Sequence, residues 1–231
     1  MIYPIRINKY LAQKKVCSRR EADELIKEGK VELNGKLAQL GDKINENDKV
    51  FVQGDLKKLV YLAFNKPKGI VTNSPQEGES SIADMLEFNY EVFPLGRLDK
   101  ESRGLILLTN DGRVTDRLLN PAYMHEKEYV VKVNKPIDDN FVNTIEAGIK
   151  LDDGYVTRKC KLKIIDDFTF TIVLTEGKNR QIRRMCRFMK YGIVDLKRIR
   201  IMNICLGDIK AGDYKEIYGE ELEDFLSMIN L

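Results

Sequence analysis

The chain has 231 residues, of which 43% are hydrophobic and 32% are charged, so it can form one large domain or two modest ones and is not disordered throughout. No apolar run approaches the roughly 20 residues that a transmembrane helix needs, and the N-terminus lacks the apolar region of a secretory signal. The formal net charge is only +3, which does not by itself predict a nucleic-acid ligand.

The cysteines and the single histidine exclude several kinds of site. The four cysteines lie far apart without a C-x-x-C pair, which predicts neither a zinc site nor a disulfide framework. Scattered reduced thiols are typical of a cytoplasmic protein. His125 is the only histidine, so a serine triad would depend on it alone, and no G-x-S-x-G motif accompanies it.

The first 60 residues predict two helices, a hairpin and a further strand. Apolar residues at helical spacing predict a helix over 6–13. Ser18-Arg19-Arg20-Glu21 is a capping box that begins a second helix. Asn34-Gly35 between alternating residues predicts a hairpin over 30–38, and a short strand follows over 48–52.

This segment carries 13 basic and 9 acidic residues, and its cations gather around the two predicted helices. Two interpretations stay open from the charges alone, a solvated helix face or a surface that contacts phosphates. The candidate contacts for the second interpretation are Arg6, Lys9, Arg19 and Arg20.

The order and spacing of R-I-N-K-Y-L-A and C-S-R-R-E-A-D-E-L-I-K-E-G-K-V-E-L-N-G resemble the S4 RNA-binding domain. The resemblance implies an S4 domain over residues 1–58, with a linker at about 53–59, whose basic helices face structured RNA. Proteins read RNA helices mostly by shape and backbone, which suits such a surface.

The rest of the chain alternates apolar runs with polar turns. Residues 59–65 form an apolar run that predicts a buried strand, and Lys66-Pro67-Lys68-Gly69 ends it as a turn. The other predicted elements are strands over 70–72, 105–108 and 126–133, a hairpin over 161–165 and 168–174, a short helix from Ile82 and an acidic terminal helix from Glu220.

A single aspartate stands in the loop G-R-L-D-K-E-S-R-G, ahead of the apolar strand over 105–108. Glycines at both ends of this loop permit tight turns or close approach of another backbone. A loop aspartate most often binds its own backbone, and the alternative is a carboxylate that performs chemistry. Composition alone leaves both interpretations of Asp99 open.

The segment E-G-K-N-R-Q-I-R-R-M-C predicts a helix with an apolar stripe beside a basic stripe. The basic stripe consists of Arg180, Arg183, Arg184 and Arg187. Residues 176–200 hold nine basic and two acidic residues, whereas residues 208–231 hold two and seven, so the near-neutral total conceals a polarised molecule. A basic stripe of this kind can bind RNA or dock a protein partner.

Four motifs occur in the order in which the ribosomal RNA pseudouridine synthases carry them. The segment resembles that family, and among its large-ribosomal members it resembles the F type most. The motifs are N-K-P-K-G, G-R-L-D-K-E-S-R-G-L-I-L-L-T-N-D-G, H-E-K-E-Y-V-V-K-V and E-G-K-N-R-Q-I-R-R-M. Arg103 departs from the smaller or uncharged residues usual at its position. The resemblance implies an α+β fold: the small N-terminal domain plus a synthase domain over 59–231, with a mainly antiparallel central sheet flanked by helices.

The resemblance also implies roles for individual residues. Asp99 matches the essential carboxylate, Arg183 the basic residue that pairs with it, and Tyr129 the aromatic that stacks on the target base. Arg97 would occupy the space of the flipped base or hold a phosphate, and Ile182 would pack under the uracil. The basic stripe and two lysines complete the predicted RNA contacts, and for the two lysines the alternative is a purely structural role in a turn: Arg180, Arg184, Arg187, Lys66 and Lys68.

The implied function is the site-specific isomerisation of uridine to pseudouridine in ribosomal RNA, with 23S RNA, free or in an assembling large subunit, as the substrate. It implies no cofactor, metal, membrane or obligate protein partner, and a cytoplasmic monomer. The alternatives are a non-catalytic RNA-binding factor of ribosome assembly and a synthase that acts on 16S or transfer RNA.

Overall fold

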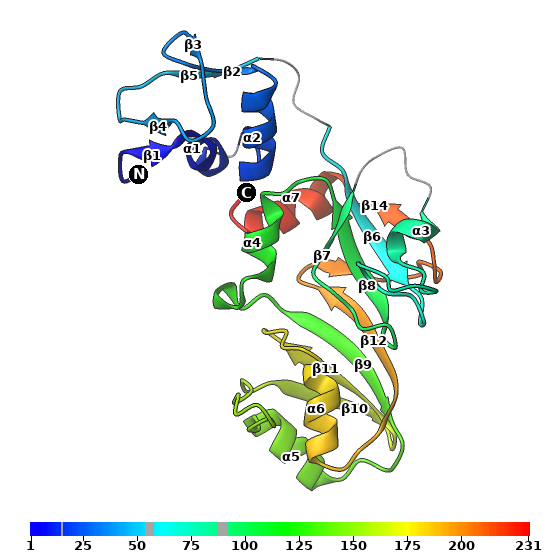
Figure 1. The fold of residues 1–231 in the computed structure, drawn as a ribbon. Helices are drawn as coiled ribbons and strands as arrows, with labels where there is room; N and C mark the ends of the chain where they lie inside the picture. The colour runs from blue at the N-terminus through cyan, green and yellow to red at the C-terminus, as the bar shows by residue number, and fades with distance from the viewer. Residues whose placement is uncertain (15, 54–57, 87–91) are drawn as a thin grey trace.

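The computed structural model describes residues 1–14, 16–53, 58–86 and 92–231, and over those residues the strands form three sheets. Two small sheets belong to an N-terminal unit, and a nine-stranded sheet runs through the rest of the chain (Figure 1). The elements of the N-terminal unit are β1 (Ile5–Arg6), α1 (Ile7–Gln13), α2 (Arg19–Lys27), β2 (Val31–Leu33), β3 (Lys36–Leu37), β4 (Lys43–Ile44) and β5 (Val50–Val52).

The local signals of the N-terminal segment are confirmed. Ser18 accepts a hydrogen bond from the backbone of Glu21 and donates its own backbone N–H to the Glu21 carboxylate at 2.7 Å, which completes the capping box of α2. Asn34 and Gly35 both have positive φ angles, as the tight turn between β2 and β3 requires. β5 pairs with the other edge of β2.

The N-terminal unit has a core of its own. α1 and α2 bury Ile7, Leu11, Ala22 and Ile26 against Val31 of β2. β1 also pairs with β4, an interaction that the sequence analysis did not predict. Strands of two residues carry no readable alternation, so only tertiary packing reveals them.

The large sheet has the strand order β10-β11-β9-β12-β8-β6-β14, with β7 paired to β8 and β13 paired to β12. Among the described residues every pairing in it is antiparallel except that of β8 with β12, so the predicted mainly antiparallel α+β fold is confirmed. The strands are β6 (Tyr61–Lys66), β7 (Phe93–Leu95), β8 (Arg103–Thr109), β9 (Lys127–Val133), β10 (Lys161–Asp166), β11 (Thr169–Leu174), β12 (Ile193–Ile201), β13 (Ile204–Cys205) and β14 (Tyr214–Glu216).

Helices cover the sheet in two groups. α5 and α6 pack on β9 and β11, where Tyr129, Val131 and Val133 are buried as the alternation predicted. α4 and α7 pack on one face of β6 and β8, and Ile82 of α3 packs on the other. The helices are α3 (Ile82–Met85), α4 (Val114–Leu119), α5 (Asp139–Ala147), α6 (Gln181–Phe188) and α7 (Gly219–Met228), with a 3₁₀ turn at Pro121–Tyr123. None of the helices in the described parts of the chain is long and apolar enough to cross a membrane.

Some local predictions differ from the structure. The predicted strand over 70–72 is wrong, because Val71 makes only an isolated bridge with Ser81. The predicted linker over 53–59 includes residues 54–57, which lie outside the described residues. The sequence analysis also assigned no element to α4, α5 or β12, although β12 lies at the centre of the sheet.

The parallel junction of β8 with β12 explains two residues of the loop motif. Arg103 makes a bidentate ion pair with Asp195, with its Nη2 2.7 Å from Oδ2 and its Nε 3.0 Å from Oδ1. Gly104 has a φ of +104°, and a Cβ placed there would lie 2.2 Å from the carbonyl oxygen of Arg198. Both residues therefore hold β8 against β12.

Replacing Gly104 with Ala should destabilise the fold by on the order of 4 kcal/mol, because the added Cβ meets backbone and not a movable side chain. Gly154 is a matched control, since it also has a positive φ of +82° but has open space around its Cα. Gly154→Ala should cost only about 1 kcal/mol. Urea unfolding measures both free energies, and equal losses would contradict the close approach of β8 and β12.

Candidate active site

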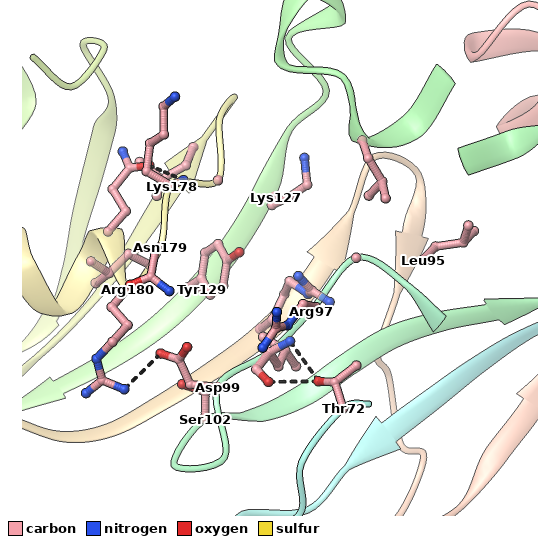
Figure 2. Close-up of a pocket in the computed structure, with 18 of the residues that line it drawn as sticks. Thr72, Leu95, Arg97, Asp99, Ser102, Lys127, Tyr129, Lys178, Asn179 and Arg180 are labelled. Atoms are coloured by element: carbon pink, nitrogen blue, oxygen red, sulfur yellow. Dashed lines mark hydrogen bonds and ion pairs between the residues drawn. The ribbon is translucent and has the colours of Figure 1, made fainter. Parts of the chain in front are cut away.

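A cleft of about 770 Å³ lies across the large sheet and contains the residues predicted to be catalytic. Its walls come from the loop between β7 and β8, from the start of β9 and from the loop that leads into α6 (Figure 2). These segments are far apart in the sequence. The cleft is large enough for a nucleoside and open enough for a polymer to enter it.

The loop that carries Asp99 is held by hydrogen bonds. Thr72 anchors it, since its hydroxyl donates to the carbonyl of Leu98 at 2.8 Å and accepts from the Leu98 N–H at 3.0 Å. The Ser102 N–H closes the turn by donating to the Asp99 carbonyl at 2.9 Å. The carboxylate of Asp99 receives no such backbone bond within the described residues and is 27% exposed in the cleft, so it is available for chemistry.

Two arginines from the α6 region surround this carboxylate. Arg183 places Nε 3.4 Å from Asp99 Oδ2, and Arg180 places Nη1 3.6 Å from the same oxygen. Arg183 is further fixed by Nη2, which donates to Ser102 Oγ at 3.0 Å and to the Glu101 carbonyl at 3.1 Å. The Nε–H of Arg183 is buried and has no hydrogen-bond partner in the part of the chain that the structure describes. Catalytic contacts often tighten only when substrate binds, so the Asp99–Arg183 pair is poised for that change.

The approach to α6 explains how Arg180 reaches the cleft. Arg180 is the N-cap of α6 and has a φ of +49°, a conformation that costs a non-glycine residue roughly 1–2 kcal/mol. The buried carboxylate of Glu176 holds the preceding loop, since it accepts from the side chains of Tyr155 and Gln181 and from the Arg158 N–H. The strained cap therefore persists because its neighbours fix it.

Tyr129 and Ile182 form the apolar part of the cleft, and both are buried in the core that α6 shares with β9. Tyr129 lies between Lys127 and Asp99 in the view of Figure 2. An aromatic ring beside a carboxylate held by guanidinium groups offers a stacking surface and a nucleophile or base in one place.

The predicted RNA contacts fall into three groups. Arg97, Arg180, Ile182 and Arg183 line the cleft, whereas Arg187 is exposed elsewhere on α6. Arg184 turns away from the cleft and pairs with Asp152 and Asp153. The exposed cations outside the cleft, whose RNA contact stays a prediction, are Lys68, Arg6, Lys9, Arg19 and Arg20.

The prediction that Lys66 contacts RNA is wrong, because its side chain is 0% exposed. Its ammonium donates to the carbonyls of Pro67 at 2.9 Å and Ile70 at 2.5 Å, which cross-links the turn below the Asp99 loop. Burial lowers the pKa of Lys66 to about 8, and the nearby carboxylates of Asp99 and Glu101 oppose this shift. The turn-residue interpretation is therefore the correct one.

Several cleft residues were missed by the sequence analysis. Thr72 and Ser102 act through hydrogen bonds to the Asp99 loop and to Arg183. Lys127 and Arg198 also line the cleft, and they come from neighbouring strands that are distant in the chain. Their charges broke the apolar pattern of otherwise buried strands, which was the one signal available.

Comparison with known proteins places this geometry in context. A family model described as RNA pseudouridylate synthase matches residues 60–188, and a model of the S4 domain matches residues 5–50. The chain is 44% identical to the dual-specificity RNA pseudouridine synthase RluF of Escherichia coli (strain K12), over 97% of this chain and 79% of that protein. It is 34% identical to the ribosomal large subunit pseudouridine synthase B of Bacillus subtilis (strain 168), over 94% of both chains. A solved structure described as a pseudouridylate synthase superposes with a TM-score of 0.71 and 25% identity, over 97% of this chain and 99% of that one.

Proposed function

The chain belongs to the RNA pseudouridylate synthase family, and from that premise we propose that it isomerises a uridine of ribosomal RNA at the Asp99 cleft. The observation that carries the proposal is the meeting of Asp99, two arginines and Tyr129 in one cleft. The reaction breaks the N1–C1′ bond of uridine, turns the uracil and joins its C5 to C1′.

Asp99 is the proposed catalytic carboxylate. It would act at the ribose, either by attacking C1′ or by removing a proton, and both roles need its ionised form. The guanidinium groups of Arg180 and Arg183 favour that charged form after RNA covers the cleft and removes water. Tyr129 would stack on the uracil and Ile182 would pack beneath it.

The target base must leave its helix before it can reach Asp99. Extruding a base costs a few kcal/mol, which contacts with the protein must offset. Arg97 is exposed at the rim of the cleft and would fill the vacated space or hold a phosphate. The floor of the cleft is then free to receive the uracil.

We propose that residues 1–58 form an RNA-docking domain and residues 59–231 the catalytic domain. The separate core of the N-terminal unit and the S4 match over 5–50 support this division. Four cysteines without disulfides support a cytoplasmic protein. The proposed active species is a monomer without an obligate protein partner, because the residues of the proposed site all come from one chain.

The proposed substrate is 23S RNA, free or in an assembling large subunit. The basis is the function named for the B-type relative, a synthase of the ribosomal large subunit, and the 44% identity to RluF. The test is to incubate the protein with transcripts of 23S, 16S and transfer RNA that carry tritium at uridine C5. The proposal expects tritium release from 23S RNA above all. Release only from 16S or transfer RNA would overturn the target, and no release from any RNA would favour a non-catalytic assembly factor.

Neutralising Arg19 and Arg20 together should weaken RNA binding through lost phosphate contacts. Both side chains are exposed at the start of α2. The double Gln variant should reduce the slope of log affinity against log salt by about 2, since each phosphate contact contributes roughly 1. Filter binding between low and high salt measures this slope. Lys161 and Lys163 on β10 are exposed matched controls, and an equal change on neutralising them would argue against a specific docking surface.

A further inference from the structure

Arg198 is a buried cation in the cleft with an unused hydrogen-bond donor. Its side chain lies on β12, the residue is only 4% exposed, and its Nε donates to the Leu105 carbonyl at 2.7 Å. Its Nη2 is buried and has no hydrogen-bond partner among the residues that the structure describes. An unpaired guanidinium N–H in such a place is costly unless a ligand completes it.

Lys127 is a second cation on the same floor. It lies two residues before Tyr129 on β9, so the two side chains share a face of the sheet. Its ammonium donates to the His125 carbonyl at 3.2 Å. Burial lowers the pKa of Lys127 to about 8, and the nearby charge of Arg198 adds to the shift.

The two cations meet beside the stacking surface. Arg198 is the register partner of Tyr129, and Lys127 lies next to it along β9. Both residues line the same cleft as Asp99, and Figure 2 shows Lys127 on the far side of the Tyr129 ring from Asp99. A base stacked on Tyr129, with its sugar at Asp99, would therefore direct its far edge toward Lys127 and Arg198.

We propose that Lys127 and Arg198 bind the carbonyl oxygens of the flipped uracil and stabilise the negative charge that the base gains when it leaves C1′. This inference rests on the proposed function and adds two residues to it. When the N1–C1′ bond breaks, its electron pair stays on the uracil and spreads over O2 and O4. After rotation, C5 bonds to C1′, the C5 proton is lost to water, and N1 takes up a proton.

The position of the cations favours a base over a phosphate. A phosphate of the RNA backbone keeps its hydration at the surface, whereas Arg198 is almost fully buried at the cleft floor. Donors aimed at a charge that develops only during reaction lower the barrier in a site without water. They would also reject cytosine, which presents an amino group where uracil has O4.

The test is Lys127→Met, which removes the charge and keeps an unbranched side chain. We expect kcat for tritium release to fall by about 10²–10³-fold, with little change in RNA affinity. Lys127→Arg should restore most of the activity. Lys132→Met is the matched control, since Lys132 lies on the same strand with an exposed side chain, and it should leave kcat unchanged.

The dependence of kcat on pH separates the charge from a packing role. The wild-type rate should fall as pH rises through about 8, because Lys127 loses its proton there. Arg198 and His125 are the charged or titratable groups facing it, and Arg198 stays charged throughout this range. Lys127→Arg should abolish the fall.

Other outcomes would overturn the inference. Wild-type kcat in Lys127→Met, or a loss confined to RNA affinity, would remove Lys127 from the reaction and make it a backbone contact or a packing residue. Arg198→Lys keeps the charge but cannot both bind Leu105 and donate into the cleft, so a folded variant with full kcat would exclude Arg198. An inactive wild-type protein would instead refute the proposed function itself.

Discussion

Asp99→Asn should lower the release of tritium from C5-labelled RNA by roughly 10⁴-fold or more, since it removes the group that acts at the ribose. The amide is nearly the same size, and the Asp99 loop is held by Thr72 and Ser102, so the variant should fold. RNA should still bind, because the amide would add no bulk to the cleft. Single-turnover release and filter binding measure the two properties separately.

The matched control for this variant is Asp195→Asn. Asp195 is also a partly exposed carboxylate paired with an arginine, but it contacts Arg103 outside the cleft. Its replacement should leave turnover unchanged and cost only modest stability. Near wild-type release by Asp99→Asn would exclude the carboxylate from the reaction, whatever the control shows.

Arg183→Lys should lower turnover by about 10²-fold although the charge is kept. The Arg183 fork directs Nε toward Asp99 while Nη2 binds Ser102 Oγ and the Glu101 carbonyl. A lysine has a single ammonium, so it cannot make these contacts in the same directions. Single-turnover rates at saturating RNA report this loss without interference from binding.

Arg180→Lys provides the comparison, because Arg180 reaches the same Asp99 oxygen at 3.6 Å but is 44% exposed. A contact so open to water contributes little, and its charge survives the change, so the expected loss is small. Equal rates for Arg183→Lys and the wild type would show that charge alone suffices at position 183. A larger loss at Arg180 than at Arg183 would reverse their proposed order of importance.

Sequence motifs predicted the catalytic set because the chemistry fixes residue types within short segments. Asp99, Tyr129 and Arg183 each lie in a motif whose local structure was also predicted, and the structure brings all three to one cleft. The apolar stripe of α6 likewise predicted the burial of Ile182 and Met185. What these motifs share is that spacing along the chain decides which face each residue occupies.

The failures came from contacts between distant segments. Lys66 looked like a surface lysine in a turn, yet the Asp99 loop covers it and three carbonyls face its ammonium. Arg198 and Lys127 lie in neighbouring strands that no local pattern could pair. Arg103 departs from the family pattern, and its pair with Asp195 across the β8–β12 junction explains why an arginine fits there. Lone charges within buried strands mark such long-range contacts without naming the partner.

The central claim is that this chain makes pseudouridine in large-subunit ribosomal RNA by means of Asp99. Mapping pseudouridines in the ribosomal RNA of cells with and without the gene tests it most directly. The account predicts that a uridine of 23S RNA loses its modification in the deletion strain, regains it with the wild-type gene and does not regain it with Asp99→Asn. An identical pseudouridine map in both strains, or restoration by Asp99→Asn, would contradict it.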